Sequence, residues 1–158
     1  MSQETARACL RSLGLEDRIR VSAADTATVA TAAAAFGIAP EQIAKTLSFL
    51  VNGEAVLVLA EGTARVDNRK FKDAFGVKAR MIPPEEVEAL VGHAPGGVCP
   101  FGIREGVRVY MDESLRKFDR VYPAAGDAHT AVDLTVEELE RCARPLGWVD
   151  VTKEPAPV

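Results

Sequence analysis

A short loop rich in glycine and proline is the stretch whose composition most favours contact with a ligand. It reads Gly96-Gly97-Val98-Cys99-Pro100-Phe101-Gly102. Adjacent glycines let a backbone pass close to a ligand and direct successive N–H groups at an anion or a carbonyl oxygen. The loop matches neither a Walker A motif nor the GxGxxG of a dinucleotide site. It is therefore either an ordinary tight connection or a ligand-facing loop of another kind.

Four single residues are further candidates, each with an ordinary structural alternative. Lys45 opens an apolar run and lies either in solvent or at the rim of a pocket. Cys99 is either a nucleophile or a small buried thiol. No neighbour in sequence is expected to lower its pKa, which favours the buried thiol. His129 is on a loop and is either a surface residue or a site residue. Asp133, between apolar neighbours in a strand, needs a partner for its carboxylate, either structural or in a site.

Metal and disulfide chemistry are not expected. Cys9, Cys99 and Cys142 are widely spaced, and no pairing with His93 or His129 has the spacing of zinc ligands. We predict reduced thiols, a cytoplasmic location and no metal or other cofactor.

Length and charge exclude several classes of protein. The 158 residues suit one domain, and a hydrophobic share of 47% excludes wholesale disorder. The net charge of -4 argues against a sequence-blind nucleic-acid binder. The longest apolar run, 55–60, is too short to span a membrane, and the N-terminus shows no secretion signal. We expect one domain over 1–150 and a frayed tail over 151–158.

The elements that must position these residues begin with a hairpin. Two β-rich runs, Lys45–Val51 and Glu54–Ala60, flank Asn52-Gly53, the pair that a type I′ turn demands. Capping residues and periodicity predict helices over 4–14, 26–36 (capped by Asp25), 67–76, 83–91 and 135–144. The expected fold is α/β of the α+β type, with a single mixed, largely antiparallel curved sheet and surrounding helices.

Three segments, in order, resemble the YbaK and prolyl-tRNA synthetase insertion-domain family of trans-editing aminoacyl-tRNA deacylases. Residues 44–47 (AKTL) resemble its lysine-bearing strand, 96–102 its GGxSPxG loop and 131–134 (AVDL) its late strand. The similarity covers roughly residues 5–145. Cys99 replaces the usual serine, no tyrosine occurs within 19–24, and His129 falls where some members have a functional histidine.

The resemblance implies hydrolysis of the ester that joins a wrong amino acid to a tRNA, here expected to be tRNA(Pro) carrying cysteine or alanine. It implies that Lys45, Gly96 and Gly97 are catalytic. It places seven residues in the substrate pocket: Thr46, Val98, Cys99, Pro100, Phe101, His129 and Asp133. The implied partners are a tRNA acceptor end and a prolyl-tRNA synthetase, with the chain a monomer or homodimer.

Two other functions remain open: a non-catalytic module of the same fold that binds tRNA or a synthetase, and a thiol enzyme that uses Cys99. Residues 65–80 carry a net charge of +4 within this acidic chain. They form either a solvated helix face or the surface that meets the tRNA. The basic residues of this predicted tRNA surface are Arg65, Arg69, Lys70, Lys72, Lys78 and Arg80.

Overall fold

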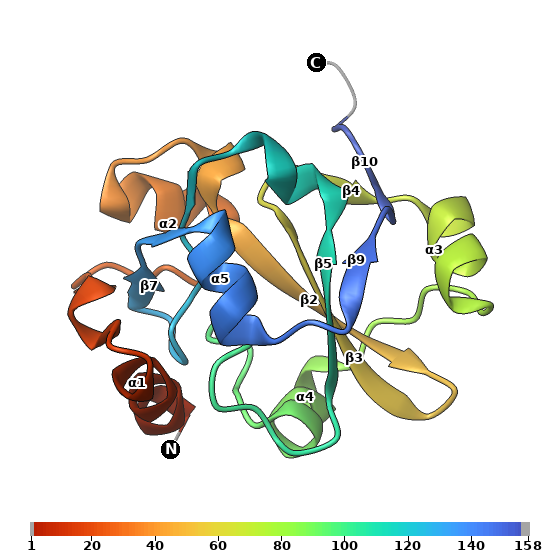
Figure 1. Ribbon diagram of the computed structural model, residues 1–158, viewed down its shortest axis with the longest axis horizontal. Coiled ribbons are helices and arrows are strands. Elements are labelled where there is room, and N and C mark those ends of the chain that lie inside the picture. The colour runs from red at the N-terminus through yellow and green to blue at the C-terminus, as the bar shows by residue number, and fades with distance from the viewer. Residues whose placement is uncertain (1, 156–158) are drawn as a thin grey trace.

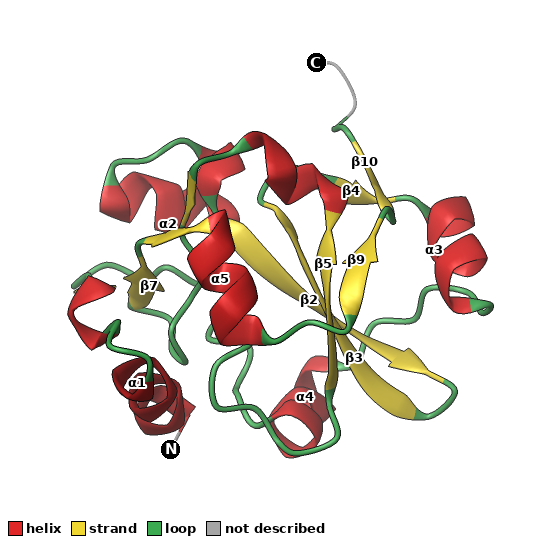
Figure 2. Ribbon diagram, in the orientation of Figure 1, coloured by secondary structure: helices red, strands yellow, loops and turns green. Residues whose placement is uncertain are grey.

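The computed structural model describes residues 2–155, which form helices around a central sheet (Figures 1 and 2). The helices are α1 (Ser2–Ser12), α2 (Val29–Phe36), α3 (Asn68–Phe75), α4 (Pro84–Val91) and α5 (Val136–Ala143). The strands are β1 (Ile19–Val21), β2 (Ala44–Val51), β3 (Glu54–Glu61), β4 (Arg65–Val66), β5 (Arg108–Asp112), β6 (Arg120–Val121), β7 (Thr130–Val132), β8 (Leu134–Thr135), β9 (Gly147–Val149) and β10 (Thr152–Lys153).

The central sheet is mixed, as predicted, and has the strand order β2-β3-β5-β9. Its β2–β3 pairing is antiparallel, whereas β3–β5 and β5–β9 are parallel. Antiparallel pairs also join β1 to β7, β4 to β10 and β6 to β8. Antiparallel pairing thus predominates among the described strands, but the sheet centre is parallel. The long connection through α3 and α4 returns the chain to the end of the sheet where β3 began, so β5 runs alongside β3.

The hairpin between β2 and β3 forms as the Asn-Gly signal predicts. Asn52 and Gly53 have φ angles of 52° and 81°, the left-handed pair that a type I′ turn requires. The turn fixes the register that pairs Lys45 with Ala60 and Thr46 with Leu59. It therefore determines which face of the sheet each of these two residues presents.

The helix before β2 begins three residues later than predicted. Thr28, not Asp25, is its N-cap, and the Thr28 and Thr31 side chains form a reciprocal capping box. The Asp25 carboxylate instead accepts a hydrogen bond of 2.7 Å from the Ala27 N–H. Residues 22–28 consequently form an irregular entry segment, which leaves Thr26 outside the helix.

The core lies on both faces of β3. Leu57 and Leu59 are fully buried in a cluster with residues of α1, α4 and α5, while the alternate residues Val56 and Val58 pack with Phe71 of α3. This alternation is the period of two that a strand imposes on its side chains. Figure 1 shows α3 at one end of the molecule and α2 at the other.

The predicted frayed tail is wrong for its first residues. Val151 is fully buried and Thr152 is buried, because the buried Asp112 carboxylate accepts hydrogen bonds from the Val151 N–H (2.8 Å) and the Thr152 hydroxyl (2.7 Å). Thr152–Lys153 then pairs with β4. Residues 156–158 of the predicted tail lie outside the described residues.

Candidate active site

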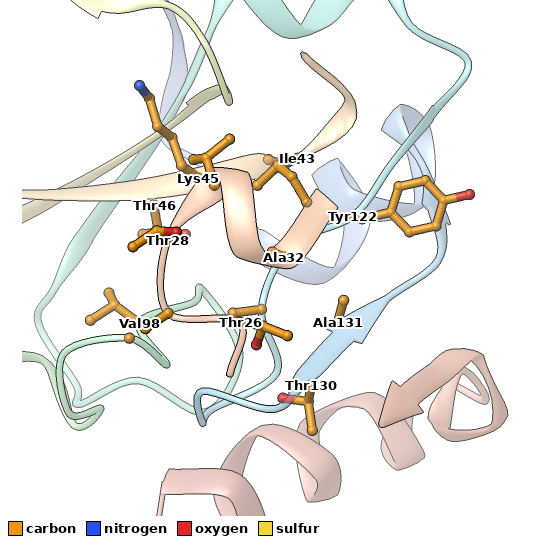
Figure 3. Close-up of a pocket in the computed structure, with 15 residues that line it drawn as sticks. Thr26, Thr28, Ala32, Ile43, Lys45, Thr46, Val98, Tyr122, Thr130 and Ala131 are labelled. Atoms are coloured by element: carbon orange, nitrogen blue, oxygen red, sulfur yellow. The ribbon is translucent and has the colours of Figure 1, made fainter. Parts of the chain in front are cut away.

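A cavity of about 170 Å³ opens between α2, the start of β2 and two loops (Figure 3). Most of its wall is apolar and built from small side chains. It is lined by Thr26, Ala27, Thr28, Val29, Ala32, Ile43, Ala44, Lys45, Thr46, Gly96, Val98, Tyr122, Ala124, Thr130 and Ala131. Four chain segments meet here, two of which contain residues that the sequence predicts: Lys45 and Thr46 on β2, and Gly96 and Val98 on the glycine-rich loop.

Lys45 stands at the rim of the cavity. As successive strand residues, Lys45 and Thr46 point to opposite sides, and Figure 3 shows the Lys45 amine directed away from Thr46 and Val98. The amine donates a hydrogen bond to the Ala64 carbonyl. Burial lowers the pKa of Lys45, and the Glu61 carboxylate opposes that shift. The rim therefore holds a partly desolvated amine.

Glu61 is a buried carboxylate near Lys45 that sequence reasoning missed. It accepts a 2.7 Å hydrogen bond from the Thr63 N–H and forms a 3.2 Å ion pair with Lys117. Burial alone would raise the pKa of Glu61, but these hydrogen bonds outweigh burial and hold the pKa below its usual value. The residue therefore supplies a negative charge close to the rim.

The two adjacent glycines have different roles. Gly96 lines the cavity with a φ of +89°, a left-handed conformation that favours glycine. The Gly97 N–H already donates to the Ala94 carbonyl at 3.0 Å, and a Cβ at this position would lie 2.5 Å from the Asp127 backbone nitrogen. Among the described residues, the N–H groups of Gly96 and Val98 have no acceptor. These two N–H groups, rather than that of Gly97, are the donors that remain for a ligand.

Cys99 and Phe101 do not line the cavity, contrary to their predicted place in the pocket. Both are fully buried, and the Cys99 sulfur lies 3.4 Å from Nε2 of the buried His93. The same nitrogen is 2.6 Å from the Phe101 carbonyl oxygen. Burial raises the pKa of Cys99 to about 12, which keeps it a thiol and makes it a poor nucleophile. Pro100 faces a separate hollow on the other side of the loop.

His129 and Asp133 also lie outside the cavity lining. His129 is exposed, and its Nδ1 lies 3.0 Å from the Ala24 carbonyl oxygen. The Asp133 carboxylate forms ion pairs with Arg20 at 3.0 Å and Arg120 at 2.7 Å. These partners satisfy the Asp133 charge at the protein surface, which favours the structural role over the site role.

Most of the remaining lining residues come from two segments, in which the sequence marked only His129, a residue that does not line the cavity. One is the entry to α2, with Thr26 and Thr28, and the other runs from Tyr122 to Ala131. The antiparallel ladder of β1 with β7 brings them together, since it pairs Val21 with Thr130. Threonine is a residue type that caps helices, so Thr28 indicates a helix start and not a ligand site.

A model of the aminoacyl-tRNA editing domain matches residues 23–142 of the chain. The chain belongs to the aminoacyl-tRNA editing family. The match spans all four segments that line the cavity, and it agrees with the family resemblance of the β2 and glycine-loop motifs.

Relatives of this editing domain occur both as separate chains and within a larger enzyme. The uncharacterized protein YwhH of Bacillus subtilis (strain 168) is 40% identical over 155 residues, covering 98% of this chain and 99% of that protein. A proline–tRNA ligase of Streptococcus suis (strain 05ZYH33) is 30% identical over 102 residues, which cover 64% of this chain and 16% of the ligase.

A solved structure supports the same fold. The crystal structure of a candidate trans-editing enzyme for prolyl-tRNA synthetase matches with a TM-score of 0.85 and 31% identity. The match covers 96% of this chain and 97% of that chain. The YbaK-like editing fold expected from the sequence is therefore confirmed.

The predicted tRNA-binding residues of this editing domain do not border the cavity. Three of them are on α3, which Figure 1 shows at the opposite end of the molecule from α2. Lys70 forms an ion pair with Asp150 at 3.0 Å. The other five predicted tRNA-binding residues are exposed: Arg65, Arg69, Lys72, Lys78 and Arg80. A tRNA that reaches them must extend well beyond the cavity mouth.

Two other features are absent from residues 2–155. No cluster of histidine, cysteine, aspartate and glutamate in that range could hold a metal ion. Nor does the range contain a helix long and apolar enough to cross a membrane.

Proposed function

We propose that this chain is a trans-editing deacylase that hydrolyses the ester bond of a mischarged tRNA. The expected substrate is tRNA(Pro) carrying a small amino acid such as cysteine or alanine, and the expected compartment is the cytoplasm. Membership of the editing family supports a tRNA substrate. The likeness to a proline–tRNA ligase and to a candidate trans-editing enzyme for prolyl-tRNA synthetase supports the choice of tRNA and makes that synthetase the expected partner.

The cavity beside Lys45 and Gly96 is the observation on which the proposal rests. Its volume of about 170 Å³ is close to that of the roughly 150 Å³ cavity known to bind benzene. A ligand of about six non-hydrogen atoms therefore fits, which is the size of a small aminoacyl group. Five alanines in the lining leave this room: Ala27, Ala32, Ala44, Ala124 and Ala131.

Ester hydrolysis requires little of the protein, because an aminoacyl ester is already activated. Water attacks the carbonyl carbon, the carbonyl oxygen becomes an oxyanion, and the ribose oxygen leaves as a hydroxyl after taking up a proton. The Gly96 and Val98 N–H groups are donors for the oxyanion, and such a donor typically contributes about 10²–10³ in rate. The Lys45 amine at the rim would hold the ribose or terminal phosphate, which fixes the ester over the cavity.

The test is a panel of tRNAs charged with different amino acids, with release measured for the wild type, Lys45→Ala and Lys153→Ala. Lys153 is exposed and does not line the cavity, so it controls for loss of a lysine charge. We expect release by the wild type and Lys153→Ala, with a loss of about 10²-fold or more in Lys45→Ala. No release by the wild type, or full release by Lys45→Ala, would contradict the proposal.

One observation favours a non-catalytic tRNA-binding module instead. The Lys45 amine is hydrogen-bonded to the Ala64 carbonyl and points away from the cavity. The Lys45 ammonium has two further donors, but they reach the ester only if the side chain turns toward the cavity when the tRNA binds. Tight tRNA binding without turnover across the panel would support the binding module.

A further inference from the structure

Four threonines line the cavity, and their hydroxyl groups fall into two classes. The Thr28 hydroxyl accepts a hydrogen bond from the Thr31 N–H at 3.1 Å, and the Thr130 hydroxyl accepts one from the Ala125 N–H at 3.2 Å. The hydroxyl oxygens of Thr26 and Thr46 are buried and have no hydrogen-bond partner among the described residues. The two unpartnered hydroxyls come from different segments, the α2 entry and β2, and both residues are in the cavity wall (Figure 3).

An unpartnered buried hydroxyl is unfavourable, because it loses its hydrogen bonds to water and gains none in return. Thr26 is only 7% exposed, so solvent does not compensate. A valine has nearly the same shape and would avoid this loss. Two such hydroxyls in the wall of one ligand-sized cavity therefore indicate that the ligand supplies their partner.

We propose that Thr26 and Thr46 are specificity-determining residues that hydrogen-bond a side-chain hydroxyl of the bound aminoacyl group. The inference rests on the proposed deacylase function, keeps its class of small aminoacyl groups, and replaces the expected cysteine or alanine with a hydroxylated amino acid. The site then prefers a small hydroxylated amino acid, of the serine type, over alanine and 2-aminobutyrate.

Hydrogen-bonding capacity distinguishes these substrates better than size does. A hydroxyl can donate to one threonine and accept from the other, whereas a thiol is a weak donor and acceptor and a methyl group is neither. Seryl and 2-aminobutyryl groups have the same number of non-hydrogen atoms, so the cavity volume does not separate them. An analogue that lacks the hydroxyl leaves the buried polar groups of the site unpaired, so the site rejects it strongly. An apolar pocket discriminates only weakly between substrates of similar size.

The experiment compares kcat/KM on tRNA(Pro) charged with serine, 2-aminobutyrate or alanine. We expect the wild type to favour seryl over 2-aminobutyryl by at least about tenfold. Thr26→Val and Thr46→Val should each lower that ratio by roughly 5- to 100-fold, because each removes one hydrogen bond to the substrate hydroxyl. Neither variant should melt below the wild type, since the lost hydroxyl has no partner in the protein.

Thr135→Val is the matched control. It removes a hydroxyl that caps α5 and lies outside the cavity lining. This variant should therefore melt at a lower temperature and keep the wild-type ratio of seryl to 2-aminobutyryl release.

Each contrary result has a distinct meaning. Equal release of the seryl and 2-aminobutyryl groups by the wild type overturns the inference and leaves the deacylase function standing. An equal fall on all three substrates in the valine variants also overturns it, since the hydroxyls would then bind the α-amino group common to all. Failure to release any amino acid from any tRNA overturns the proposed function, and the inference with it.

Discussion

Replacing Gly97 with alanine is expected to separate two segments that lie against each other at the cavity. A Cβ at this position would lie 2.5 Å from both the Asp127 backbone nitrogen and the Gly126 carbonyl carbon. Backbone atoms cannot rotate aside as a side chain does, so residues 126–128 must move. Overpacking typically costs about 1–3 kcal/mol, and a contact made wholly with backbone belongs at the upper end, about 3 kcal/mol. In a domain of this size that corresponds to a fall of roughly 6–12 °C in Tm.

The assay pairs thermal melting with deacylation, and Gly147→Ala is the control. A Cβ at Gly147 meets nothing within 4 Å, and its φ is not left-handed, so this variant should melt at or slightly above the wild-type temperature. Gly96 lies beside Ala128, since a Cβ built at Gly96 would lie 3.5 Å from that of Ala128. Displacement of 126–128 should therefore also lower kcat/KM by about tenfold or more. Equal melting temperatures for the two alanine variants would refute the steric reasoning.

Three further predictions concern buried polar groups. Cys99→Ser should retain deacylation close to that of the wild type, because the thiol lies outside the cavity, whereas a thiol enzyme would lose activity. Burial lowers the pKa of His93. The stabilisation from its neutral imidazole is therefore fully present above about pH 6.5, the pKa in the unfolded state, and is lost as the pH falls through the lower pKa of the folded state. The fall in Tm between about pH 7.5 and 5 should be smaller in His93→Gln. Asp112→Ala should cost about 3 kcal/mol or more in chemical denaturation, because it leaves buried donors such as the Thr152 hydroxyl without an acceptor; a loss below about 1 kcal/mol would contradict this.

Elements with strong local signals could be predicted from the sequence, and long-range pairings could not. The Asn52-Gly53 turn and the Thr135 capping box depend on residues within a few positions of each other, and both form as predicted. The parallel pairing of β3 with β5 and the buried contact of Asp112 with Thr152 join residues about 40 or more positions apart. No local pattern distinguishes these pairings from their alternatives.

The predicted loop and the observed cavity lining coincide only at alternate residues. The sequence placed the whole loop from Gly96 to Phe101 in the site, but the lining alternates: Gly96 and Val98 face the cavity, whereas Gly97 and Cys99 pack away from it. In an extended segment, neighbouring residues point to opposite sides. A motif read as a continuous string therefore assigns too many residues to the pocket.

In the proposed site, the catalytic groups and most of the cavity wall come from different segments, and β2 contributes to both through Lys45 and Thr46. The β2 and glycine-loop residues provide the amine and the N–H donors suited to ester hydrolysis, a reaction that is the same for every aminoacyl group. Thr26 and the Tyr122–Ala131 segment contribute much of the remaining wall. The β1–β7 ladder joins these two segments, and the Tyr122 carbonyl accepts a hydrogen bond from the Ala44 N–H at the start of β2. Substitutions of wall side chains such as Thr26 and Ala131 can change the shape and polarity of the cavity, provided that the backbone of residues 126–128, against which Gly97 packs, stays in place. Differences in amino-acid specificity among editing domains of this fold should therefore be sought first in these two segments.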